Sequence, residues 1–284
     1  MGRAREEDPV MPTIAEPNVD LGRHRGWNPL AADPVATAGS SYLGSRNGAL
    51  ECILEPPRPP NPAEVAVHDH LREWVLGEGY PCVGARSAFN RRLYRFGLYP
   101  ELGAGTVARA LCHDLYEFAY EMGSLETVFV TFIAVFSRPK AMSEVEFERL
   151  MWVQLQTMHD IDGKYFPWDP EVSCDPENER FSFSIGARAY FVVGMHHLAS
   201  RKARQFPYAT LVFNLHEQFE RMRERGKFEM FRDMIRARDV AFSGSINPVL
   251  TNFGSSSEAR QYSGRAVEDD WRCPFAPSSE KAAE

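Results

Sequence analysis

The stretch VFVTFIAVF (residues 128–136) decides the fold, because it carries no charge and consists largely of aromatic and β-branched residues. Such a run is typical of a central strand that is buried on both faces of a sheet. The segment SEVEFERLMWVQLQTMHDID (143–162) follows it and has the periodicity of an amphipathic helix. Ser143 and Glu146 match a capping box at its start. We therefore predict a buried strand followed by a helix that packs against the sheet.

Further helices and strands are predicted on both sides of this pair. One helix begins at residue 62, where Asn61 is suited to the N-cap, Pro62 to the first turn and Glu64 to the N-terminal charge, and it ends before Gly77. The other predicted elements are a helix over 106–122, a hairpin over 180–195, a strand over 208–215 and one long helix over about 217–239. Because these elements do not follow a strict βαβ order, the sequence predicts an α+β fold with a mixed, largely antiparallel sheet packed with helices.

Both ends of the chain differ in composition from the part between them. Residues 1–45 are rich in Pro, Ala, Gly, Asp and Arg and show no sustained periodicity, and the terminal segment PSSEKAAE is similar. We predict a disordered arm over 1–45, a single folded domain over 46–276 and a disordered tail over 277–284.

Composition and charge argue against several classes of protein. The net charge of −7 argues against a nucleic-acid binder that relies on phosphate contacts. No run of about 18 apolar residues occurs and no apolar signal segment begins the chain, so we expect neither membrane insertion nor secretion. Five scattered cysteines form no CxxC pair, which favours reduced thiols. We expect a cytoplasmic, soluble protein; the sequence allows a homodimer but does not fix the oligomeric state.

The stretch GAGTVA (103–108) matches the glycine pattern of dinucleotide-binding loops. That pattern requires a hydrophobic strand before it, and RLYRFGLYPEL is interrupted there by Pro100 and Glu101. We therefore interpret the glycines as the entrance to a helix.

Histidines are the more informative candidates for chemistry. In FVVGMHHLASR (191–201) an apolar run ends directly on His196 and His197, and basic residues follow. Neutral imidazole is a good ligand for iron, copper or zinc, and the end of a strand holds it rigidly. His159 ends a predicted helix and His216 ends a predicted strand. The residues alone leave a structural role for His196 open beside a metal or haem role.

Several motifs in order are similar to those of the YqcI/YcgG family. They are YPC (80–82), VVGMHH (192–197), SRKARQF (200–206), FNLHEQFERMR (213–223), EARQYSGR (258–265) and CPF (273–275). The resemblance covers about residues 60–276. Family members are described by FPC and CPF motifs, so the tyrosine of YPC is a departure.

The resemblance implies a function. Some members of this family are haem-dependent N-oxygenases of specialised metabolism, including antibiotic biosynthesis, that hydroxylate the guanidino nitrogen of L-arginine, and others oxidise the side-chain amine of lysine. It therefore implies haem b, dioxygen and an external electron donor, with a basic amino acid as substrate. The expected activity is formation of N-hydroxy-L-arginine; the alternatives are oxidation of lysine and a haem-binding sensor or transfer protein without oxygenase activity.

Site residues are predicted on this basis. His196 is the expected iron ligand, because the family pattern has proline after the first histidine, and His197 and His159 are the candidate catalytic imidazoles. Ligation by His159, His216, Cys82 or Cys273 stays open. Arg201 and Arg204 are suited to the haem propionates, and Phe191 and Phe213 to the porphyrin faces. Asp160 and Glu217 are the candidate carboxylates for the cationic substrate.

Overall fold

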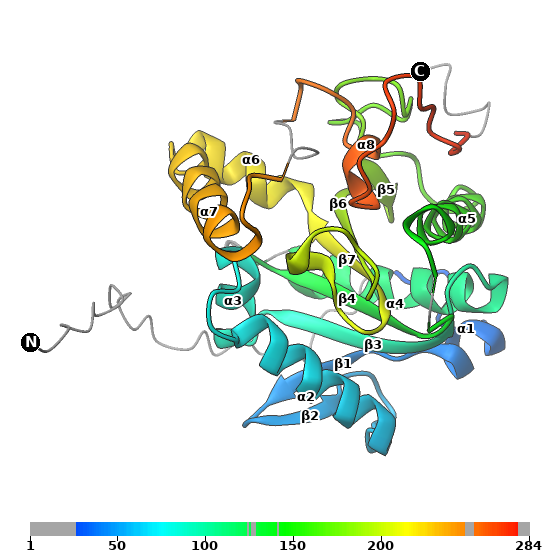
Figure 1. The fold of residues 1–284 in the computed structure, drawn as a ribbon. Coiled ribbons are helices and arrows are strands. Elements are labelled where there is room, and N and C mark those ends of the chain that lie inside the picture. The colour runs from blue at the N-terminus through cyan, green and yellow to red at the C-terminus, as the bar shows by residue number, and fades with distance from the viewer. Residues whose placement is uncertain (1–26, 124, 126–128, 141, 248–252, 278–284) are drawn as a thin grey trace, which may run out of the picture.

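The computed structural model describes residues 27–123, 125, 129–140, 142–247 and 253–277. A seven-stranded sheet with the order β2-β1-β3-β4-β7-β6-β5 runs through the molecule (Figure 1). Its strands are β1 Leu43–Arg46, β2 Ala49–Cys52, β3 Tyr94–Glu101, β4 Thr131–Arg138, β5 Phe183–Ile185, β6 Arg188–Met195 and β7 Ala209–Leu215. Only β3 and β4 pair in parallel. The predicted α+β class and the mixed, largely antiparallel sheet are confirmed.

Strand β4 lies at the centre of the sheet, as its composition predicts. Its side chains alternate between two hydrophobic clusters, with Phe132 and Phe136 in one and Ile133 and Val135 in the other. All four are at most 3% exposed. Burial on both faces explains why this strand reads as an unbroken apolar run.

Helices cover both faces of the sheet (Figure 1). They are α1 Pro34–Gly39, α2 Pro62–Leu76, α3 Val83–Asn90, α4 Gly105–Gly123, α5 Glu144–Asp162, α6 His216–Glu224, α7 Phe228–Ser243 and α8 Ala259–Tyr262, with the 3-10 turn η1 Lys202–Arg204. Side chains of α1, α4, α5 and α8 pack into the larger hydrophobic cluster, on what we call the first face. Helix α2 packs into the smaller cluster on the second face, where α3 and α7 also lie.

Helix starts follow the predicted capping chemistry. At α2, the Asn61 side chain accepts from the Glu64 N–H at 2.9 Å, and the Glu64 carboxylate accepts from the Asn61 N–H at 2.8 Å. At α5, the Ser143 hydroxyl accepts from the Glu146 N–H, whereas the Glu146 carboxylate pairs with Arg149. The capping box is therefore complete at α2 and half made at α5.

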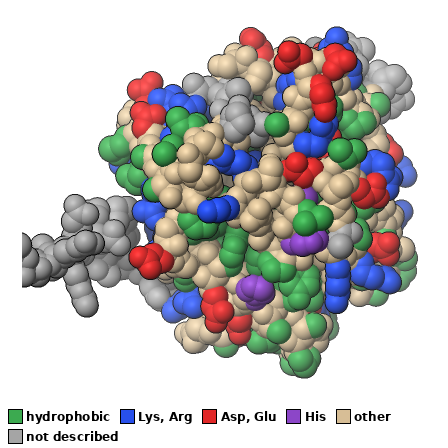
Figure 2. All heavy atoms as spheres, viewed as in Figure 1, with side chains coloured by type: hydrophobic (Ala, Val, Ile, Leu, Met, Phe, Trp, Pro, Cys, Tyr) green, Lys and Arg blue, Asp and Glu red, His purple; other side chains and the backbone are tan. Residues whose placement is uncertain are grey.

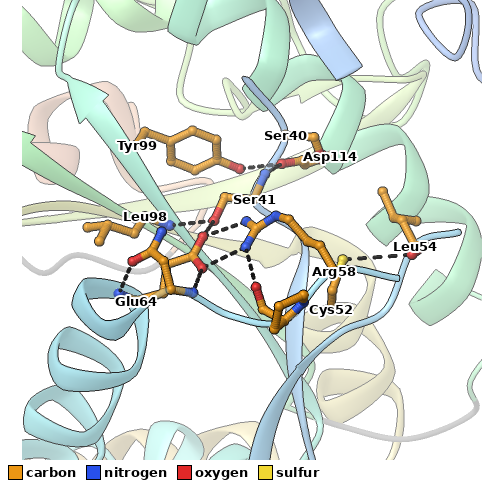
Figure 3. A network of polar contacts seen from close by, with 11 residues as sticks. Ser40, Ser41, Cys52, Leu54, Arg58, Glu64, Leu98, Tyr99 and Asp114 are labelled. Atoms are coloured by element: carbon orange, nitrogen blue, oxygen red, sulfur yellow. Dashed lines mark hydrogen bonds and ion pairs between the residues drawn. The ribbon is translucent and has the colours of Figure 1, made fainter. Parts of the chain in front are cut away.

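The predicted arm is shorter than the composition indicates. Residues 27–45 belong to the folded domain, because α1 and the start of β1 lie there and Leu30 and Tyr42 are at most 2% exposed. Buried polar contacts hold this segment in place: Asp114 of α4 accepts from the Ser40 hydroxyl, the Ser41 N–H and the Tyr99 hydroxyl (Figure 3). These contacts are long-range and leave no periodic signal in the sequence. Residues 1–26 and 278–284 lie outside the described residues.

Two further predictions differ from the structure. The long helix expected over 217–239 is two helices, α6 and α7, because Gly226 adopts φ +64° between them. The segment before GAGTVA does form a strand, β3, and α4 connects it to its parallel neighbour β4. At that turn the Gly103 N–H donates to the Gln154 side chain and the Leu102 N–H to the Arg138 carbonyl, so both are occupied within the protein.

The hairpin and the last strand are confirmed. Strands β5 and β6 pair through Ser184 and Ala189 around a turn at Gly186, and β7 begins within one residue of its predicted start. Among the described helices, none combines the length and the apolar character that a membrane crossing requires.

Candidate active site

A cavity of about 260 Å³ lies between the second face of the sheet and the helices that cover it. Its floor consists of side chains that alternate along three neighbouring strands, since every second residue points to the same face. They are Thr131 and Ile133 of β4, Val212 and Asn214 of β7, and Phe191, Val193 and Met195 of β6. Residues of α2, α3, α7 and the η1 loop form its roof and walls. Strands β4, β7 and β6 at the middle of the sheet thus form one wall of the cavity.

One end of the cavity is polar but uncharged. Thr131, Asn214 and Phe191 lie in register across β4, β7 and β6, so they form one row of the floor. The Asn214 amide donates to the Phe191 carbonyl at 3.2 Å. The Gln218 amide accepts from the Val130 N–H at 2.9 Å and donates to the Val130 carbonyl at 3.3 Å. We call this row, with Gln218, the amide end.

The opposite end of the cavity is charged. Arg201, Arg204 and Asp239 line it, beyond Met195 at the end of β6. The Arg201 guanidinium donates to the Asp239 carboxylate at 2.5 Å. Met195 lies four positions after Phe191 on β6, which places the two ends about 13 Å apart at 3.3 Å per residue. Valine and isoleucine side chains lie between them, so the cavity is an apolar channel with two different polar ends.

Arg204 is buried, and no carboxylate among the described residues accepts from its guanidinium. Its nitrogens donate to the carbonyl oxygens of Gly194, Tyr262 and Gln261 at 3.0–3.2 Å. Burial lowers the pKa of Arg204 to about 10. The three carbonyls tie the η1 loop to β6 and α8, and the buried positive charge favours an anion at this end of the cavity.

Cys82 lies in the cavity wall at the start of α3. Its sulfur accepts from the Ala85 N–H at 3.4 Å and so caps that helix. Burial raises the pKa of the Cys82 thiol, which is therefore protonated at neutral pH. Among the described residues that line the cavity, no histidine occurs, and the soft donors for a metal are the Cys82 thiol and the Met195 thioether.

A model of the YqcI/YcgG family matches residues 71–276. This chain belongs to the YqcI/YcgG family. It is 27% identical over 210 residues to "Putative N(omega)-hydroxy-L-arginine synthase DcsA" of Streptomyces lavendulae, a match that covers 69% of this chain and 78% of that protein. It is 26% identical over 207 residues to "Uncharacterized protein YqcI" of Bacillus subtilis (strain 168), covering 69% and 80% of the two chains. No solved structure matches.

The two cysteine motifs of the family occupy different parts of the fold. Tyr80, Pro81 and Cys82 line the cavity on the second face. In the CPF motif, Phe275 packs on the first face against His159 and Trp168, with ring centroids 5.1 and 5.9 Å away. Burial raises the pKa of Cys273 to about 12. Of the two motifs, YPC is the one that contributes to the cavity.

His196 lies on the first face and does not line the cavity. It follows Met195, whose side chain faces the cavity, and the alternation along the strand directs the His196 ring to the other side. There it stacks on Phe147 of α5 at 4.5 Å, is 1% exposed, and its Nδ1 has no hydrogen-bond partner among the described residues. Burial lowers the pKa of His196 to about 4, so the ring is neutral. The predicted iron ligand is thus separated from the cavity by the sheet.

The other predicted histidines lie in separate surroundings. The His159 ring contacts Trp168 and Phe275, and His216 lies 3.1 Å from the Glu220 carboxylate and 3.9 Å from that of Glu258. His197 is half-buried beside His196. Among the described residues, no three His, Cys, Asp or Glu side chains form a metal-binding group. The structure therefore brings no pair of these imidazoles together as haem ligands.

Of the remaining predicted site residues, Phe191, Arg201 and Arg204 line the cavity. Phe213 is fully buried in the core of the first face. Asp160 is exposed and accepts from Gln156, and Glu217 is half-exposed and pairs with Arg188 and Arg221. Neither carboxylate faces the cavity.

The acidic residue that does line the cavity is Asp239, which the sequence analysis missed. It shares one stripe of α7 with Phe231 and Ile235, at a spacing of four residues. Positions i, i+4 and i+8 fall on the same face of a helix. A carboxylate that ends an apolar stripe was the available signal, and it was hidden because α7 was interpreted as part of one long charged helix.

Proposed function

We propose that this chain hydroxylates a guanidino nitrogen of L-arginine in the cavity, with dioxygen and an external electron donor. The observation that carries the proposal is the match to a protein named as an N(omega)-hydroxy-L-arginine synthase, which spans more than two thirds of both chains. The types of residue that line the cavity also support the proposal. An amino acid with a cationic side chain requires a carboxylate, a cation and an apolar passage for its methylene groups, and Asp239, Arg201 and Val193 provide them.

The donor set of the cavity fits haem b, which we propose as the cofactor. Cys82 would supply a thiolate ligand, Phe191 and Phe231 flat apolar surfaces, and Arg204 a cation for a propionate. Bound haem supplies the reductive activation of dioxygen. The 260 Å³ cavity is smaller than the usual range of about 300–1,000 Å³ for small-molecule sites, so binding of a porphyrin would require it to widen.

The residues of this chain would perform three tasks in the reaction. The apolar floor and roof exclude water, which strengthens electrostatic interactions with a charged substrate. The amide end provides neutral hydrogen-bond groups, Asn214 and Gln218, which orient a polar group without adding charge. The charged end attracts a zwitterionic amino acid because both signs of charge are present there.

The direct test is a turnover experiment with the purified full-length protein. The protein is loaded with haem, supplied with a chemical reductant and oxygen, and incubated with L-arginine, L-lysine or agmatine. We expect N-hydroxy-L-arginine, detected by mass spectrometry with incorporation of one atom from labelled O₂. A haem-loaded protein that consumes oxygen without oxidising any of the three compounds would overturn the proposal.

A further inference from the structure

Helix α7 has an unusual distribution of burial. Among its residues, all of which the structure describes, Asp239 is the only one that is fully buried. Phe231 and Ile235 are half-buried at the cavity, whereas Met230 and Met234 are 64% and 47% exposed. Hydrophobic side chains lie among charged ones on the outer surface over α6 and α7, at the left of the view (Figure 2). A helix of this length usually buries an apolar stripe instead. The α7 wall is therefore weakly packed, and its best-buried side chain is a carboxylate.

The Asp239 carboxylate is held by an arginine from the opposite side of the cavity end. One carboxylate oxygen accepts from Arg201 at 2.5 Å and the other from the Ser243 hydroxyl at 3.0 Å. Arg201 also donates to the hydroxyl and the carbonyl oxygen of Ser245, at 2.8 and 2.6 Å. The Arg201 Nε is buried without a hydrogen-bond partner among the described residues. The ion pair connects α7 to the η1 loop at the point where the cavity ends.

A buried ion pair of this kind contributes little to stability. Desolvation of the two charges offsets most of their attraction, whereas loss of one partner leaves the other charge buried and is costly. A second cation that enters the cavity avoids this cost, because it gives the Asp239 carboxylate a new partner as Arg201 leaves. Positive-φ glycines, Gly226 at +64° and Gly244 at +82°, flank α7 and allow its ends to pivot.

We propose that Asp239 is the specificity-determining residue that binds the cationic side chain of the substrate. Arg201 is then an internal cation that occupies this carboxylate until the substrate displaces it. The inference rests on the proposed function, because it names the group that recognises the side chain of a basic amino acid. Among the described residues that line the cavity, Asp239 is the one carboxylate, and a carboxylate accepts bidentate hydrogen bonds from a planar guanidinium.

Displacement has a second consequence for Arg201. Once the substrate cation pairs with Asp239, the Arg201 guanidinium is released at the same end of the cavity, where it can bind a carboxylate. Substrate binding therefore replaces the ion pair between Arg201 and Asp239 with two ion pairs to the substrate. This exchange distinguishes L-arginine, which carries a cation and a carboxylate, from L-citrulline, which lacks the cation, and from agmatine, which lacks the carboxylate.

The test is titration calorimetry of the full-length, haem-loaded protein with these three ligands. Asp239→Asn is expected to weaken binding of L-arginine and agmatine by about 10- to 100-fold, the range for loss of a charged hydrogen bond, and to leave L-citrulline unchanged. Arg201→Gln is expected to tighten binding of agmatine, because the competing cation is gone. Asp233→Asn is the matched control, since Asp233 is exposed on the same helix and pairs only with its neighbour Arg232 among the described residues.

The two variants are expected to change the affinity for agmatine in opposite directions. An ion pair with a purely structural role does not produce this result. Equal weakening of all three ligands in both variants would overturn the inference, as would unchanged binding in Asp239→Asn. If Asp239→Asn fails to fold, Arg201→Gln decides alone, and unchanged or weaker agmatine binding refutes the displacement. Failure of the proposed function is separate: wild-type protein that discriminates L-arginine from L-citrulline but forms no hydroxylated product keeps the binding site and loses the reaction.

Discussion

Phe191 and His196 lie five residues apart on one extended segment, and their side chains point to opposite faces of the sheet. Phe191 lines the cavity, and its ring also lies 5.8 Å from the ring of Tyr262, whereas the His196 ring stacks on Phe147 of the first face. An odd spacing on a strand always separates two side chains in this way. The His196 imidazole therefore does not line the cavity, whose soft donors among the described residues are the Cys82 thiol and the Met195 thioether.

The first prediction concerns the iron ligand of the haem-loaded protein. Cys82→Ser is expected to abolish the red-shifted Soret band that a thiolate gives to the ferrous carbon monoxide complex, whereas His196→Ala is expected to keep it. Absorption spectra of the ferric, ferrous and carbon monoxide forms provide the measurement. Cys174→Ser is the control, because Cys174 is half-buried but does not line the cavity. A spectrum that only His196→Ala alters would place haem on the first face.

The second prediction concerns the pH dependence of haem binding. Burial raises the pKa of the Cys82 thiol, and a metal binds the thiolate, so binding must release one proton. The affinity for ferric haem is therefore expected to rise about tenfold per pH unit below that pKa and to level off above it. Haem titrations at several pH values measure this slope. The same slope in Cys82→Ser would show that the proton comes from another group.

Local chemistry made several elements predictable from the sequence. The Asn61 cap, the apolar run of β4 and the hairpin before His196 each depend on neighbouring residues, and all three are confirmed. Residues 27–45 were missed because their order depends on distant partners such as Asp114. Helix α7 was misread because one glycine, Gly226, separates it from α6.

Predicting the site was harder for a physical reason. The sequence shows which residues follow a strand. It does not show on which face of the sheet their side chains lie until the register is known. Arg201 and Arg204 line the cavity because both follow β6 within a short loop, and their role at the haem propionates stays a prediction. Asp160 and Glu217 were selected for their charge, and both are solvated or paired with surface arginines.

The third prediction concerns stability and pH at the buried carboxyl of Glu258. Burial raises its pKa from 4.5 to about 8, and Tyr262 and Ser182 hydrogen bond to it. Because the folded pKa lies above the unfolded one, this contribution is fully present below about pH 4.5 and is lost as the pH rises toward 8. Glu258→Gln is expected to flatten this loss, measured as the free energy of unfolding in urea between pH 5 and 8.

Neighbouring groups set the background for this measurement. Burial lowers the pKa of His216, 3.9 Å from Glu258, so the neutral imidazole makes the protein less stable as the pH falls through the ordinary histidine range. The two groups act in opposite directions, and only the difference between Glu258→Gln and wild type isolates the carboxyl. Glu229→Gln, at an exposed position of α7, is the control. Parallel pH curves for wild type and Glu258→Gln would refute the assignment.

The last prediction concerns Gly194, where β6 packs against α5 and the end of α8. A Cβ added there would lie 2.5 and 2.8 Å from two carbons of the Phe147 ring and 2.9 Å from the Tyr262 carbonyl oxygen. The ring is held between the sheet and His196, so neither neighbour can move freely. Gly194→Ala is expected to lower the free energy of unfolding by about 1–3 kcal/mol, the range for overpacking a core.

Gly105→Ala, with no atom within 4 Å of the added Cβ, is expected to be neutral or slightly stabilising. Urea unfolding of both variants measures the difference, and equal stability of Gly194→Ala and wild type would show that the strand and α5 pack less tightly than this contact requires.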